Sequence, residues 1–279
     1  MQRSTVLIAI ALVTFSVSAA SMRADQLSVL SADNYAVLGA STVTNTGPSV
    51  LNGNLGLYPG TSITGFPPGI VNGTIYDGVA AAHSGQTDAL AAYGYLAGLS
   101  VTGTLTGEDL GALTLTPGVY FFSSSAQLTG PLTLNFEGLN NQNVVFLIGS
   151  TLTTASGSSV VIEGAGTGDN VYWHVGSSAT LGTTTAFIGD IIANTSITLN
   201  TGVTITCGDA IALTGAVTLD HNTISTCAGG TNGTGGSGGT GGTGVAGGVI
   251  NTTPEPGTFG LLATGILGVA GALRRRLLA

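Results

Sequence analysis

The segment "GDIIANTSITLNTGVTITCGDAIALTGAVTL", residues 189 to 219, contains one pattern twice. Its two Gly-Asp pairs begin 19 residues apart, and the leucines that end the two copies, Leu199 and Leu219, are 20 apart. Each copy consists of short β-branched runs separated by Gly and Asn. Short strands that repeat at a period near 19 predict a β-solenoid, in which every coil buries a row of aliphatic side chains against its neighbours.

The repeat continues towards the N-terminus. The stretch "VYWHVGSSATL" (171 to 181) resembles "VVFLIGSTL" (144 to 152), so we align Leu152 and Leu181 with the two later leucines as one corner of successive coils. The wider gap between Leu152 and Leu181 is assigned to a polar, glycine-rich loop at residues 163 to 170. A jelly roll or sandwich is the competing all-β fold, but it does not need matching coils.

One segment departs from the β pattern. Residues 79 to 99 carry apolar residues at helical spacing and predict a single amphipathic helix along the solenoid, ending near Gly98. His83 and Asp88 on this helix are interpreted as solvated or capping residues, and His174, which follows Trp173 in a strand, as a hydrogen-bonded structural histidine. The residues expected on the buried side of the helix are Ala82, Gln86, Ala89, Leu90, Tyr93, Leu96 and Ala97.

The charge distribution excludes one class of partner. Between Asp25 and Leu273 the chain has 13 acidic residues and no Lys or Arg. Nucleic acid is therefore not an expected partner, because phosphate binding needs clustered cations.

The two ends of the chain predict export. Residues 1 to 20 have Arg3, an apolar run and small residues before a cleavage site, which is typical of a secretory signal peptide. Residues 254 to 279 combine Pro254-Glu255-Pro256, an apolar segment at 258 to 273 and three arginines, and they resemble a bacterial PEP-CTERM sorting signal. That resemblance implies an exosortase-type peptidase as a partner, with a cell-surface or secreted destination after transient membrane anchoring. An uncleaved transmembrane anchor is the alternative.

The folded part is expected between these signals. Residues 228 to 253 are mostly Gly, Thr and Ser and predict a flexible linker, which leaves residues 25 to 227 as the solenoid domain. Cys207 and Cys227 each lie eight residues after a repeat leucine, so we expect them in adjacent coils, whose strands are ~4.8 Å apart. A disulfide between them is then feasible and would stabilise the domain by ~3 kcal/mol.

The chemistry of an enzyme or a cofactor site is not apparent. The acidic residues are scattered, and the histidines His83, His174 and His221 belong to different elements. Asp190 and Asp209 occupy equivalent places in the repeat and could bind calcium as stacked carboxylates, although a recurring Gly-Asp turn explains them more simply. We expect no catalytic residue, no metal site and no cofactor.

Threonines are the candidate functional residues. Counting from the aligned leucines, Thr154, Thr183 and Thr201 fall two positions later, with His221 in the last coil. A face of stacked hydroxyls and methyls without charge could order water into an array that merges with ice. Thr on a solvent-exposed strand face is the structural alternative.

A family resemblance supports the ice hypothesis. The segments at 27 to 47, 53 to 60, 89 to 96, 115 to 122, 171 to 182, 196 to 204 and 215 to 224 look like the microbial ice-binding protein family. The resemblance implies a mostly β fold, a three-sided, discontinuous, right-handed β-solenoid with one long helix alongside, and a motif of Thr, Ala or Gly, any residue, then Thr or Asn, which Thr201-Gly202-Val203-Thr204 matches. The predicted ice-binding residues are Thr154, Ser156, Thr183, Thr184, Thr185, Thr201, Thr204, Asn222 and Thr223.

Two functional hypotheses follow. The first is a secreted protein that adsorbs to ice and inhibits its growth or recrystallisation. The second is a cell-surface or biofilm-matrix adhesion protein on the same scaffold, with extracellular polysaccharide as its partner. Glycan binding predicts exposed aromatic side chains along a groove, so the positions of Tyr58, Tyr76 and Tyr172 discriminate between them.

Overall fold

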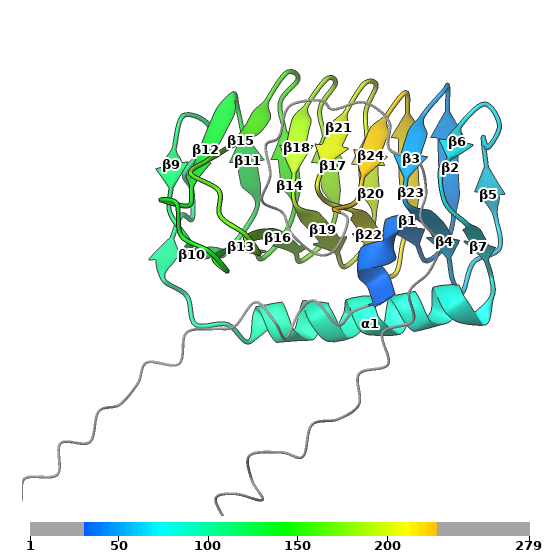
Figure 1. The fold of residues 1–279 in the computed structure, drawn as a ribbon, viewed down its shortest axis with the longest axis horizontal. Coiled ribbons are helices and arrows are strands. Elements are labelled where there is room, and N and C mark those ends of the chain that lie inside the picture. The colour runs from blue at the N-terminus through cyan, green and yellow to red at the C-terminus, as the bar shows by residue number, and fades with distance from the viewer. Residues whose placement is uncertain (1–30, 228–279) are drawn as a thin grey trace, which may run out of the picture. The chain divides into compact units, whose positions relative to one another are not determined.

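The computed structural model describes residues 31 to 227, so the predicted signal peptide, the linker and the sorting signal lie outside the described residues. The described part is one β-solenoid built from three parallel sheets, a short 3₁₀ helix η2 (Ser31–Asn34) and one long helix α1 (Ala80–Ala97), as Figure 1 shows. Every strand pair is parallel, and each complete coil places one strand in each sheet. The predicted mostly β, three-sided solenoid with one flanking helix is confirmed.

Sheet A is the side against which the helix packs. From one end of the solenoid to the other, its strands are β7 (Ile75–Asp77), β4 (Asn54–Leu57), β1 (Tyr35–Gly39), β22 (Ala210–Ala212), β19 (Asp190–Ala193), β16 (Asn170–Val175), β13 (Asn143–Ile148), β10 (Gly118–Phe122) and β8 (Gly103–Thr104).

Sheets B and C form the other two sides. Sheet B contains, in spatial order, β5 (Ile63–Thr64), β2 (Val43–Thr46), β23 (Val217–Asp220), β20 (Ile197–Leu199), β17 (Ala179–Leu181), β14 (Leu152–Thr154) and β11 (Ala126–Leu128). Sheet C contains β6 (Ile70–Val71), β3 (Val50–Asn52), β24 (Thr223–Ser225), β21 (Thr204–Thr206), β18 (Ala186–Ile188), β15 (Ser159–Glu163), β12 (Pro131–Asn135) and β9 (Thr114–Leu115).

The solenoid is discontinuous in sequence. The first coil, β1 to β3, pairs with the last coil, β22 to β24, so the blue and orange strands lie side by side in Figure 1. From there the chain builds outward to β7, and α1 then runs along sheet A to the opposite end. Strands β8 to β24 return coil by coil to the starting point. Each of the three sheets therefore combines strands from both ends of the folded sequence.

The interior is a single apolar column. Aliphatic and aromatic side chains from all three sheets are buried in one cluster along the solenoid axis. Trp173 on β16 lies within it with no exposed surface, stacked on Phe146 at a ring separation of 4.0 Å and packed on Phe187 at 4.8 Å. Its indole N–H donates to the carbonyl of Ile188 at 3.0 Å, so its one polar atom is satisfied.

A second apolar cluster joins α1 to the outer surface of sheet A. The helix buries small residues, including Gly85, where a Cβ would lie 2.8 Å from the Tyr35 ring. Gln86 anchors the helix by donating to the carbonyls of Gly39 and Ala212. The predicted span and the Gly98 terminus are confirmed, but the predictions for Leu90 and Ala97 were wrong because both residues are exposed, Leu90 to 61%.

His174 lies inside this helix–sheet interface. Its ring stacks on Tyr93 of α1 at 3.8 Å, and both of its ring nitrogens are buried without a hydrogen-bond partner among residues 31 to 227. The interpretation of His174 as a hydrogen-bonded structural histidine was therefore wrong. Burial lowers the pKa of His174 below its usual 6.5, because the apolar interface disfavours the charged ring.

We expect acid to destabilise the fold through this histidine. As the pH falls below about 6.5, the unfolded chain takes up the proton and the folded chain does not, so the free energy of unfolding decreases until the lowered folded-state pKa is reached. Urea unfolding of the wild type and of His174→Phe at pH 7.5 and pH 5.5 measures the effect. The wild type should lose more stability than the variant over this interval. Equal losses in the two proteins would show that His174 is not the responsible group.

The register of the coils corrects one alignment. Leu181, Leu199 and Leu219 do occupy one position in β17, β20 and β23. Leu152 does not share it, because Leu152 pairs with Ala179, two residues before Leu181. Thr154 consequently does not stack on Thr183.

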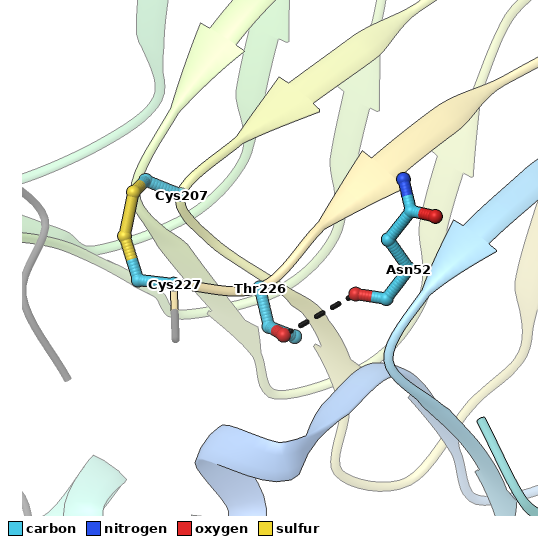
Figure 2. The surroundings of a disulfide bond; sticks show 4 residues. All are labelled: Asn52, Cys207, Thr226 and Cys227. Atoms are coloured by element: carbon cyan, nitrogen blue, oxygen red, sulfur yellow. Dashed lines mark hydrogen bonds between the residues drawn. A yellow bond between two sulfur atoms is a disulfide. The ribbon is translucent and has the colours of Figure 1, made fainter. Parts of the chain in front are cut away.

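The predicted disulfide between Cys207 and Cys227 is present, with its Cα atoms 4.4 Å apart. It joins the last two coils, and Figure 2 shows it beside the contact of Thr226 with Asn52 of β3. The cysteines are offset by one residue, since Thr206 pairs with Ser225 and Cys207 therefore lies level with Thr226. The bridge thus closes the last coil close to its contact with the first.

Candidate functional site

The outer surface of sheet B carries a row of threonines. In each of six adjacent strands, the outward residue beside an aliphatic residue of the core is Thr. The parallel strand pairing places these six threonines directly next to one another. All six are exposed or half-buried, whereas their chain neighbours on the strands point into the core. We call this row the threonine rank: Thr153, Thr180, Thr198, Thr218, Thr44 and Thr64.

The geometry of the threonine rank is set by the backbone. Adjacent strands of a sheet are ~4.8 Å apart, so the hydroxyls and methyls repeat at that interval along the solenoid. A neighbouring rank lies two residues earlier on each coil, ~6.6 Å away along the strands. Its members are mostly hydroxylated and equally uncharged: Ser125, Thr151, Ser178, Ser196, Ala216, Thr42 and Ser62.

The hydroxyls of the threonine rank are available to solvent. None of the six hydroxyls is hydrogen-bonded to another of the residues that the structure describes. In the neighbouring rank some hydroxyls are already used, since Thr151 donates to Ser125 at 2.8 Å and the Ser196 hydroxyl accepts from the backbone N–H of Ala216 at 3.2 Å. The threonine rank is therefore the part of sheet B that can bind water most freely.

The threonine rank ends at a polar border. Beyond Thr153 the next outward residue is Gln127, and Asp109 follows through an isolated parallel bridge. The Asp109 carboxylate accepts the backbone N–H groups of Gly111 in its own turn and of Thr129 in the neighbouring coil, so both coils hold it in place. The threonine rank and the neighbouring rank are thus uncharged from β14 to β5, and a carboxylate enters these strands only at Asp220, the last residue of β23.

Three of the predicted ice-binding residues lie inside the protein. Thr154, Thr185 and Asn222 are at most 3% exposed and line the corner between sheets B and C. The hydroxyls of Thr154 and Thr185 are 2.8 Å apart and bond to each other, and Thr185 also donates to the carbonyl of Gly182. Buried side chains with these partners hold the corner turns and cannot contact a crystal surface.

The other predicted residues are exposed but do not share one plane. Ser156, Thr183, Thr184 and Thr201 lie in the turns of the B–C corner, and Thr204 and Thr223 face outward from sheet C, where they pair with each other. The matching motif Thr201-Gly202-Val203-Thr204 therefore bends around the corner. Gly202 allows this bend because its φ is +75°.

The sequence contained a signal for the threonine rank that leucine counting missed. Thr180, Thr198 and Thr218 each come directly before an aligned leucine. Because successive residues of a strand face opposite sides, the residue next to a buried leucine must face outward. Searching one position before the leucine, rather than two after it, finds these three of the six members of the rank.

The remaining candidates have structural positions. Tyr172 is buried, and Tyr58 and Tyr76 are half-buried, with Tyr58 against His83 and Tyr76 against Tyr35. These tyrosines do not form the exposed aromatic groove that glycan binding predicts. Within residues 31 to 227 no group of three or more His, Cys, Asp or Glu side chains could hold a metal ion. None of the helices in this range has the length and hydropathy of a membrane span.

Comparison with known proteins finds relatives over most of the chain. An ice-binding protein of Nostoc sp. (strain HG1) is 57% identical over 219 residues, which cover 78% of this chain and 81% of the relative. Ice-binding protein K3-B1 of Typhula ishikariensis is 31% identical over 70% of this chain and 87% of its own length.

Solved structures agree with the sequence relatives. The crystal structure of an ice-binding protein from Antarctomyces psychrotrophicus matches with a TM-score of 0.68 and 37% identity, covering 71% of this chain and 97% of that chain. Residues 252–276 match the PEP-CTERM protein-sorting motif. Residues 37–225 match the ice-binding-like family model, and the chain therefore belongs to the ice-binding-like family.

Proposed function

We propose that this protein binds ice through the threonine rank on sheet B and thereby inhibits ice growth or recrystallisation. The observation that carries this proposal is the six-strand row of uncharged Thr side chains whose hydroxyls have no partner within residues 31 to 227. Its relatives that are named ice-binding proteins support the choice of ligand.

The physical basis is an ordered water layer on a rigid surface. Each hydroxyl of the rank can hold one water, and each methyl disfavours disordered water beside it. Because the apolar column fixes every strand of sheet B, the bound waters repeat at the strand spacing without further ordering of the protein. Adsorption of such a layer would stop the advance of a crystal face.

No catalytic role is proposed. A hydrolase would need two carboxylates converging on a substrate. The carboxylate of Asp109 accepts two backbone N–H groups, and the fully buried Asp169 accepts those of Gln142 and Gly166. Membership of the ice-binding-like family supports the same conclusion.

The site of action is proposed to be outside the cell. The signal-like residues 1 to 20 would direct export, and an exosortase-type peptidase would recognise Pro254-Glu255-Pro256 while the segment 258 to 273 anchors the chain transiently. The matching sorting motif supports this route. Nothing found in residues 31 to 227 favours extracellular polysaccharide as a partner.

Ice recrystallisation inhibition by the purified secreted protein tests the proposal. We expect ice grains held just below the melting point to stay small with the protein, and to coarsen with a non-binding protein of equal net charge. Coarsening at the same rate in both samples would overturn the ice-binding proposal. The hypothesis of a cell-surface or biofilm-matrix adhesion protein would then take its place.

A further inference from the structure

The threonine rank crosses the discontinuity of the solenoid. Thr218 on β23 pairs with Thr44 on β2, although 174 residues separate them in the sequence. Thr153 to Thr218 come from the continuous coils, whereas Thr44 and Thr64 come from the coils that precede the helix. The row forms one straight array only if these two groups of coils dock in a fixed register.

The corner between sheets B and C is irregular at this junction. In the last coil only His221 and Asn222 separate Asp220 from the sheet C strand. In the preceding coil, the connection between the same two sheets has three residues, 201 to 203. In the first coil, which lies on the other side, this connection also has three residues, 47 to 49. A short corner therefore lies between two longer ones, and its backbone cannot follow the pattern of its neighbours.

Buried polar groups compensate for this mismatch. At the neighbouring corners the N–H of the residue before the sheet C strand donates to a carbonyl within its own turn, as Val203 does to Asn200 and Ser49 does to Gly47. The N–H of Asn222 instead donates to the hydroxyl of Ser49 in the first coil, at 2.9 Å. Ser49 is fully buried, so its hydroxyl satisfies an N–H group that water cannot reach.

The Asn222 side chain bonds in the opposite direction. Its amide group donates to the carbonyl of Asn200 in the preceding coil at 2.8 Å, and its Oδ1 accepts the N–H of Asp220 at 2.7 Å. Asn222 as a whole is 1% exposed. One residue thus contacts the coils on both sides of the junction.

Two further contacts surround this corner. The carboxylate of Asp220 accepts a hydrogen bond from the hydroxyl of Thr201 and lies 3.0 Å from the ring of His221. The backbone N–H of His221 donates to the carbonyl of Thr46 at 3.1 Å, two residues after Thr44 of the threonine rank. The corner is therefore tied to the strand that carries the first threonine beyond the junction.

From this geometry we infer that Ser49 and Asn222 are positioning residues for ice binding, because they hold Thr44 and Thr64 in one array with the rest of the threonine rank. The inference rests on the proposed function. The strand ladders bring the two coils together, and the buried corner bonds fix how the two turns of unequal length fit. Loss of the Ser49 hydroxyl leaves the Asn222 N–H buried without an acceptor, so the corner must shift.

Ser158 provides a matched control. It occupies the same corner position in the coil of β14 and β15, is 1% exposed, and its hydroxyl accepts a backbone N–H from a neighbouring coil, that of Gly130 at 3.2 Å. Ser158→Ala and Ser49→Ala therefore both remove a buried hydroxyl that accepts a backbone N–H from a neighbouring coil, and Ser158→Ala also removes a bond to the carbonyl of Leu128. Only Ser49 lies at the discontinuity.

The test is a double-mutant comparison with Thr44→Tyr, using recrystallisation inhibition by the whole secreted protein. We expect Thr44→Tyr to raise the inhibitory concentration several-fold in the wild type and in Ser158→Ala. In Ser49→Ala, whose activity is already reduced, Thr44→Tyr should change it by less than about twofold, because Thr44 has already left the array. A role in overall stability alone would leave the Thr44→Tyr effect undiminished in both serine variants.

Each outcome bears on the inference. An equal effect of Thr44→Tyr in both serine backgrounds, or a Ser49→Ala variant with wild-type activity, would overturn it while leaving the proposed function intact. An inactive wild type would overturn the proposed function and this inference together. Should Ser49→Ala fail to fold, Asn222→Val is the second variant, since Val203 fills the equivalent buried position one coil away, and the same comparison with Thr44→Tyr decides.

Discussion

Replacing Thr198 with tyrosine is expected to remove most of the ice recrystallisation inhibition without unfolding the protein. Thr198 lies at the middle of the threonine rank, between Thr180 and Thr218 on adjacent strands. A tyrosine ring there would stand above the plane and keep several neighbouring hydroxyls from contacting the crystal. If the centre of this face behaves like the centre of a protein interface, where a key contact is worth about 2 kcal/mol, the inhibitory concentration should rise about thirtyfold.

Thr204→Tyr is the control for this substitution. Thr204 is also an exposed strand threonine, but it faces outward from sheet C. We expect this variant to inhibit like the wild type, and both variants to keep the wild-type melting temperature. The reverse result, with Thr204→Tyr inactive and Thr198→Tyr active, would place the ice-binding surface on sheet C and at the B–C corner, where the sequence motif predicted it.

The fold was predictable because the sequence repeats its core. The buried Leu199 and Leu219 recur at the length of one coil, and the same spacing brings Cys207 and Cys227 within bonding distance. The helix was predictable in the same way, from apolar residues at helical spacing. The prediction failed for Leu90 because α1 contacts sheet A mainly through small residues. The Leu90 side chain is not needed in that contact.

The site was harder to predict because threonine has two roles in this fold. Thr185 and Thr198 differ little in local composition, yet the first is fully buried in a corner and the second faces solvent. Which role a threonine takes depends on where the strand ends and the turn begins, and turns differ by one residue between coils. Counting two residues after the correctly aligned Leu199 therefore reached Thr201 in the corner turn, whereas the outward residue of the strand is Thr198, directly before that leucine.

The contacts across the discontinuity could not be derived from the repeat at all. Ser49 and Asn222 are 173 residues apart, and neither belongs to a repeating motif that indicates a partner. Their pairing follows from the docking of the first coil on the last, which only the three-dimensional arrangement shows.

Trp173→Ala is expected to cause the largest loss of stability. The side chain is completely buried, packs on Phe146 and Phe187, and belongs to the core cluster that draws on all three sheets. Truncation of a large buried aromatic residue costs about 3–5 kcal/mol, because it removes apolar burial and leaves a cavity that a rigid solenoid cannot close. This is a large part of the roughly 5–15 kcal/mol by which domains are usually stable.

Urea unfolding followed by circular dichroism measures this loss, since Trp173 is the only tryptophan and its fluorescence would disappear with it. Tyr95→Ala is the matched control, because Tyr95 is an aromatic residue of α1 that is 42% exposed, and its removal should cost much less. Trp173→Phe should retain most of the stability by keeping a ring between Phe146 and Phe187. If Trp173→Ala and Tyr95→Ala lost equal stability, the column around Trp173 would not be the structural support of the threonine rank. A larger loss of stability in Trp173→Ala than in Tyr95→Ala would instead show that the outer array depends on the core. A flat array of hydroxyls on the outside requires a close-packed column inside, because only fixed strands keep the outward residues in register.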